Sequence, residues 1–230
     1  MKSIIKVFQV AFVFIGTIVG AGLASGKEIT NFFTVYGYKS FFTIIMTGLF
    51  YIFLCNIISR ISIKHSLNSY SEVINTVSPN ILGKLTGIIT TFYLISSASI
   101  ILAGSGALLN QYFGIPKIIG SIFMAIIASL ILMRETDGLV EINSIIVPSL
   151  IIVTTTLMIL YVIFANDPIT IGSLVSSTPK LSKGVFTSGI LYCGYNILCC
   201  CGVIVPLSNE VKSKKIMTWG IILGLSLIHI

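Results

Sequence analysis

The amino-acid sequence predicts an all-α integral membrane protein, and three observations support this fold class. Hydrophobic residues make up 55% of the 230-residue chain and charged residues 9%, whereas soluble domains carry about 25% charged residues. The mean hydropathy is +1.05. Apolar segments long enough to cross a bilayer recur along the chain, with basic residues in the connections between them. The net charge of +7 is therefore spread over loops, and we expect no nucleic-acid partner.

Seven apolar segments follow one another, and we expect them to form a single transmembrane domain over residues 1–230. They run roughly over 7–33, 41–58, 85–112, 115–133, 142–164, 184–207 and 216–230. A membrane-spanning helix usually needs about 20 residues. The last segment has fifteen residues and ends within an apolar run, so we expect this chain to be a truncated part of a longer protein.

The basic residues predict the orientation of the chain in the membrane. No cleavable signal peptide is recognisable at the N-terminus. With the N-terminus in the cytoplasm and the loop over 165–183 outside, nine basic residues lie inside and four lie outside. The four outside are Lys39, Lys117, Lys180 and Lys183.

The polar connection between the second and third apolar segments has a helical pattern of its own. Leu67, Tyr70, Ile74, Val77 and Ile81 recur at the spacing of one helix face. We expect a short amphipathic helix here, at the cytoplasmic interface.

The first apolar segment contains the glycine-rich string GTIVGAGLASGKE over residues 16–28. Glycine costs roughly 1 kcal/mol relative to alanine in a helix, so four glycines predict that this helix stops and starts again. The first half would end near Gly16 to Gly20 and offer free carbonyls to a cation. The second would begin near Ala21 to Leu23 and offer N–H groups to an anion. The alternative is close helix packing through two GxxxG pairs.

Two ionisable residues, Lys27 and Glu28, follow this predicted break, together with Ser25. Adjacent residues on a helix point in different directions, so Lys27 and Glu28 cannot simply neutralise each other. Ionisable residues at membrane depth are candidates for gating or coupling. The alternative is that both lie at the outer interface, with the Lys27 ammonium reaching the headgroups.

The sixth apolar segment contains a second glycine-interrupted stretch. Gly194 lies between Tyr192 and Tyr195, and Asn196 follows; Pro206 comes later. We expect a break here as well, with an aromatic wall and a hydrogen-bonding group at mid-depth; ordinary helix packing is the alternative. Interrupted segments at corresponding positions of two halves are typical of inverted-repeat transporters. Residues 1–164 would form the first five-helix repeat and residues 184–230 the incomplete start of the second.

Enzyme chemistry is not expected. The sequence shows no nucleophile–base pair and no cluster of paired intramembrane carboxylates. The cysteines lie within apolar spans and have no histidine partners, so we interpret them as small apolar residues rather than as metal ligands or disulfides. They are Cys55, Cys193, Cys199, Cys200 and Cys201. We expect no cofactor apart from Na⁺ or H⁺ as a coupling ion.

The string GAGLASGKEITNFF, residues 20–33, resembles the first-helix signature of the YkvI-type bacterial membrane proteins of the amino acid–polyamine–organocation superfamily. Residues 192–215 are similar to that superfamily's sixth helix. The resemblance implies a LeuT-type five-plus-five fold, of which about seven helices are present and helices eight to ten are absent. It also implies two unwound segments, formed by Gly20, Ala21 and Gly22 and by Gly194, Tyr195 and Asn196.

The sequence thus predicts a multipass secondary transporter, or a fragment of one, for a small amino acid or a related organic solute. Its partners would be the lipid bilayer and that solute. The alternative is a non-transporting receptor or sensor subunit on the same fold. The expected gating or coupling residues are Glu28 and Lys27. The expected substrate-binding residues are Gly20, Ala21, Gly22, Ser25, Tyr192, Gly194, Tyr195 and Asn196.

Overall fold

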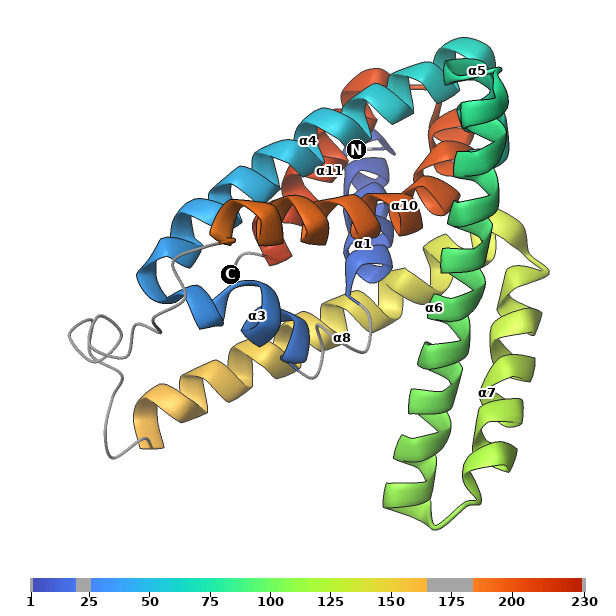
Figure 1. Cartoon of the computed structure of the whole chain (residues 1–230). Helices are drawn as coiled ribbons and strands as arrows, with labels where there is room; N and C mark the ends of the chain where they lie inside the picture. The colour runs from blue at the N-terminus through green and yellow to red at the C-terminus, as the bar shows by residue number, and fades with distance from the viewer. Residues whose placement is uncertain (1, 20–25, 165–183, 229–230) are drawn as a thin grey trace.

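The computed structural model describes residues 2–19, 26–164 and 184–228, and every regular element in these ranges is a helix (Figure 1). Four helical stretches are long and apolar enough to cross a membrane: 34–65, 81–113, 135–164 and 185–211. The predicted all-α membrane class is therefore confirmed. The elements are α1 (Lys2–Ile18), α3 (Lys27–Phe32), η1 (Thr34–Lys39), α4 (Ser40–His65), α5 (Tyr70–Val77), α6 (Ile81–Phe113), α7 (Lys117–Leu132), α8 (Glu135–Phe164), α10 (Val185–Val211) and α11 (Lys214–Ile228).

The first apolar segment contains two separate helices. α1 ends at Ile18, and α3 begins at Lys27 after Gly26, whose φ of 73° lies in the left-handed region that favours glycine. The predicted end of the first half near Gly16 to Gly20 is thus confirmed, whereas the predicted start of the second half near Ala21 to Leu23 lies outside the described residues. Four predicted site residues in the interval lie outside the described residues: Gly20, Ala21, Gly22 and Ser25.

The predicted break in the sixth segment is wrong, because α10 runs as one helix from Val185 to Val211. Gly194 is exposed, and a Cβ built there would meet no atom within 4 Å. The Asn196 side chain donates to the Tyr192 carbonyl one turn earlier, at 3.1 Å. A single glycine weakens a helix by roughly 1 kcal/mol, and the burial of α10 against its neighbours offsets that cost.

Four helices form the packed core: α1 packs on α11, and α4 packs on α10 (Figure 1). Small residues allow the close approach. A Cβ at Gly220 of α11 would lie 2.5 Å from the Val10 Cβ of α1, and one at Gly224 would lie 2.9 Å from the Phe14 ring. A Cβ at Gly189 of α10 would lie 2.5 Å from the Thr43 methyl of α4. The largest buried side chains come mainly from these helices, among them Phe14, Ile15, Met217 and Ile221.

Three helices lie around this core with most of their apolar surface exposed. α6 and α7 pack on each other where Gly106 and Gly120 meet, and α8 packs along α1 at Gly16, against the Asn143 side chain. Both α6 and α8 carry long runs of exposed large hydrophobic residues. Such surfaces suit contact with lipid.

The amphipathic helix predicted between the second and third segments is present as α5. Ser69 caps it by accepting from the Glu72 N–H at 3.3 Å, while the Glu72 carboxylate accepts from the Asn68 N–H at 2.8 Å. This arrangement resembles a capping box, but the carboxylate bonds to the N–H of the residue before the N-cap. Its buried Val73 packs with Leu67 and with Val205 of α10, so α5 is fixed to the end of the core.

Candidate functional site

The segment that follows the first-span interruption packs against α10. The Ser188 hydroxyl of α10 donates to the Phe32 carbonyl of α3 at 3.0 Å. Ser188 is 9% exposed, so this hydrogen bond is shielded from solvent. It holds the end of α3 beside the first turns of α10, and Glu28 lies one turn earlier on α3.

Five aromatic rings gather at this junction, and we call them the aromatic cluster. The Phe32 ring centroid lies 5.3 Å from that of Tyr192 and 5.6 Å from that of Tyr195. Phe33 meets Tyr192 edge-on at 4.9 Å, and Tyr192 meets Tyr195 edge-on at 5.4 Å. Tyr93 of α6 completes the cluster, 6.4 Å from Tyr195. The rings therefore join α3, α6 and α10 at one place.

Glu28 is the charged residue that faces the aromatic cluster. Its side chain is half-buried and lies near the hydroxyl groups of Tyr195, Tyr192 and Tyr93. Lys27, next to it in sequence, is exposed. The two ionisable residues thus point to different surroundings, and the carboxylate is the one that lies against the tyrosines.

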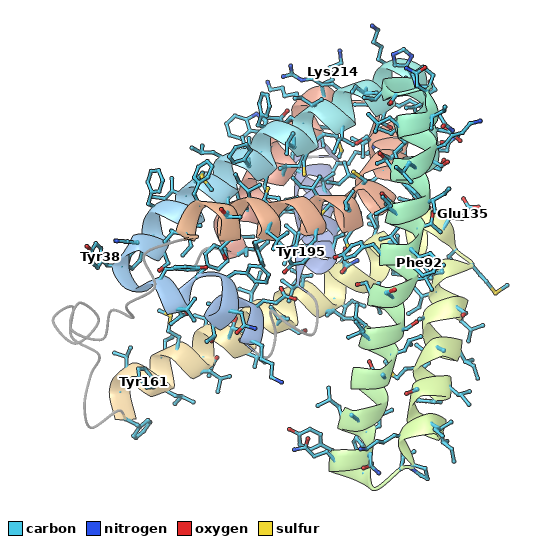
Figure 2. All side chains as sticks on the ribbon, in the orientation of Figure 1. Tyr38, Phe92, Glu135, Tyr161, Tyr195 and Lys214 are labelled. Atoms are coloured by element: carbon cyan, nitrogen blue, oxygen red, sulfur yellow. The ribbon has the colours of Figure 1, made fainter. Side chains whose placement is uncertain are left out.

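Among the described residues, three buried hydroxyl oxygens have no hydrogen-bond partner: those of Thr47, Tyr51 and Tyr195. Thr47 and Tyr51 lie one turn apart on the face of α4 that packs on α10. The Tyr51 side chain lies in one buried cluster with Tyr192, with Tyr195 packed against it, and meets Phe14 of α1 edge-on. Figure 2 shows Tyr195 near the centre of the molecule, below α10 and beside α3. Polar groups from α3, α4 and α10 converge here.

The structure brings together part of the predicted site. Glu28, Tyr192, Tyr195 and Asn196 lie at the junction of α3 with α10, with Asn196 buried. Gly194 faces away, and Lys27 is exposed.

Sequence reasoning missed Phe32, Phe33, Tyr51 and Tyr93. Phe32 and Phe33 are in the string used for the resemblance, and their place directly after the break was the signal available. Tyr51 had a weaker signal: Thr47, Tyr51 and Cys55 are spaced as one helix face.

A separate hollow of about 870 Å³ lies at the C-terminal end of α10. Polar and charged side chains line it, including Asn68, Arg134, Asp137 and Glu210. A neighbouring cavity of about 150 Å³ shares Asp137 and Glu210 and reaches Lys6 of α1. Arg134 pairs with Glu141 beside it. Several charged groups therefore lie at this end of the core, whereas Glu28 is the charged group at the central junction.

The fold and this junction define an all-helical integral membrane protein. The chain is 28% identical over 223 residues to the uncharacterized membrane protein YkvI of Bacillus subtilis, covering 94% of this chain and 61% of YkvI. It is 31% identical over 137 residues to the uncharacterized protein YyaD of the same organism, covering 60% of this chain and 39% of YyaD. The chain thus spans less than two thirds of either relative. No family model and no solved structure matches.

Proposed function

We propose that this chain is the solute-binding part of a multipass secondary transporter for a small amino acid or a related organic solute. Na⁺ or H⁺ would drive it, and the N-terminus would lie on the cytoplasmic side of the bacterial inner membrane. The solute would bind between the first-span interruption and the middle of α10. The fold and the likeness to an uncharacterized membrane protein support the membrane part of this proposal.

One observation carries the proposal: a carboxylate just beyond an interrupted first span faces tyrosines in the middle of the sixth. Irregular backbone at membrane depth is tolerated where it lies against protein or lines a cavity. Glu28 lies two residues after Gly26, beside the aromatic cluster. A half-buried carboxylate there can pair with the ammonium group of a solute or exchange a proton.

The packing of the core also supports a five-segment repeat. The first segment (α1) packs on the seventh (α11), and the second (α4) packs on the sixth (α10). If the first segment corresponds to the sixth and the second to the seventh, then the pair α1–α11 corresponds to the pair α10–α4. Four spans lie between the first and the sixth, so α10 would run opposite to α1 across the membrane and the relation would be an inverted one.

A solute screen tests this proposal on the purified chain in lipid nanodiscs. We expect one or more members of an amino-acid panel to raise the unfolding temperature, since a ligand that binds the folded state stabilises it. We expect the effect to depend on Na⁺ or on pH. The proposal fails if no amino acid, amine or betaine stabilises the protein under any cation or pH condition.

Uptake separates the transporter from the alternative, a receptor or sensor subunit. Both would bind the solute, but a transporter accumulates it in vesicles when a Na⁺ or H⁺ gradient is imposed. We expect gradient-driven uptake from a chain as long as YkvI that contains this sequence. Binding without uptake by such a chain would favour the receptor.

A further inference from the structure

The interface between α4 and α10 differs between its two halves. Toward the C-terminal end of both helices, the Ser62 hydroxyl donates to the Val205 carbonyl at 2.7 Å. In the same half, the Ser208 hydroxyl donates to the Ser59 hydroxyl at 3.0 Å. These polar groups are fully buried and paired with each other across the interface.

The other half, nearer the N-terminal ends of α4 and α10, contains hydroxyls without partners. Thr47 and Tyr51 are each 3% exposed, and neither hydroxyl oxygen has a hydrogen-bond partner. A threonine in a helix commonly donates to the carbonyl four residues earlier, as Thr86 and Thr91 of α6 do. Thr47 does not, so its hydroxyl stays available to another group.

The surroundings of these hydroxyls can supply further polar contacts. A Cβ at Gly189 of α10 would lie 3.1 Å from the Thr47 oxygen, so the backbone of α10 passes close to it. Tyr51 belongs to the same buried cluster as Tyr192, and Tyr195, whose hydroxyl has no hydrogen-bond partner in the described structure, packs against that cluster. A buried polar group left unpaired costs free energy, and ordered water with two to four polar partners removes that cost.

We propose that ordered water binds at Thr47 and Tyr51 and forms a hydration site in this half of the α4–α10 interface. The ligand is a water molecule, which both donates and accepts hydrogen bonds. The site extends from α4 toward Tyr195 and the central junction. This hydration site is expected in the solute-free protein, so its test does not depend on whether the chain binds or transports a solute.

Removing each hydroxyl tests the proposal through the direction in which the unfolding temperature changes. If water binds, Tyr51→Phe and Thr47→Val each break a hydrogen bond and lower the unfolding temperature of the solute-free protein in nanodiscs. If the hydroxyls are dry and unpaired, their removal takes away a cost and raises that temperature. Tyr161→Phe, on an exposed tyrosine of α8, serves as the matched control and leaves it unchanged. An unchanged or raised temperature in either α4 variant overturns the proposal.

A second measurement uses the unaltered chain and so does not depend on a variant that folds. Hydroxyl radicals generated by X-ray radiolysis from bound water oxidise side chains beside that water, and mass spectrometry locates the products. We expect oxidation of Tyr51 despite its burial. Phe14, which packs against Tyr51 and is 1% exposed, stays unmodified as the internal control. A Tyr51 ring as unreactive as Phe14 overturns the proposal.

Discussion

The four core helices and the helices around them have similar apolar composition but very different burial. In the most apolar window of each span, 33% of the residues are buried for 34–65 and 44% for α10, against 6% for α6 and 6% for α8. Apolar content therefore does not decide which helices pack on each other. In lipid this is expected, because the tails are as apolar as a leucine side chain.

Buried hydroxyl groups distinguish the core more clearly than glycines do: among the described residues, every buried serine or threonine except Thr90 of α6 belongs to α4 or α10. Gly189, Gly220 and Gly224 lie where neighbouring backbones approach closely, and Ser59 and Ser62 of α4 meet α10 through hydrogen bonds or buried contacts. On α6 and α8 the serine and threonine hydroxyls mostly bond to carbonyls of their own helix. The difference shows that helix association here depends on shape and on hydrogen bonds between helices.

The core and the surrounding helices are expected to present one loop each on opposite sides of the membrane. Labelling of these two loops from outside should therefore differ completely. The tip of the α6–α7 hairpin would lie outside, and the turn between α10 and α11 would lie in the cytoplasm. Single cysteines at Lys117 and at Ser213, in a background without native cysteines, test this in intact cells. We expect an impermeant thiol reagent to label Lys117→Cys and to leave Ser213→Cys unlabelled. The reverse pattern would refute the proposed orientation.

A bulky side chain at a core glycine should have the largest effect on stability. Gly220→Leu would force α11 away from Val10 of α1, and overpacking of this kind costs about 1–3 kcal/mol. Gly104→Leu on α6 is the matched control, since a Cβ there meets nothing within 4 Å. Unfolding temperatures in nanodiscs should fall for Gly220→Leu and stay near the wild-type value for Gly104→Leu. Equal losses in both variants would remove the distinction between core and surrounding helices.

A smaller effect is expected from the hydrogen bonds that join α4 to α10. Ser62→Ala removes a buried hydroxyl that bonds to the carbonyls of Leu67 and Val205, which should cost about 1 kcal/mol. Ser129→Ala on α7 removes an exposed hydroxyl bonded to its own helix and should stay within about 0.5 kcal/mol. Denaturant titration of both variants measures the difference. A loss for Ser129→Ala as large as for Ser62→Ala would contradict the account.

The sequence was sufficient to predict the membrane class, α5 and the interruption of the first segment, because each leaves a local pattern. Sequence reasoning also selected Glu28, Tyr192, Tyr195 and Asn196, because ionisable and polar residues are conspicuous in apolar spans; the structure places them together, and their role in binding stays a prediction. The break at Gly194 was wrong because one glycine, with space around it, does not stop a well-packed helix.

Two features depend on packing between distant segments rather than on a local pattern. Tyr51 enters the site through the packing of α4 on α10, and a contact between segments more than a hundred residues apart has no sequence period. The division between core and surrounding helices was missed for the same reason, since all the spans are similarly apolar.

Solute binding by two neighbouring variants tests the central claim most directly. Glu28→Gln removes the carboxylate that faces Tyr195, whereas Lys27→Gln removes an exposed charge next to it in the sequence. With a solute found in the screen, isothermal titration of the nanodisc protein should show at least several-fold weaker binding for Glu28→Gln. That corresponds to about 1 kcal/mol or more. Lys27→Gln should bind as the unaltered chain does. Equal affinity for all three proteins would contradict a site at Glu28.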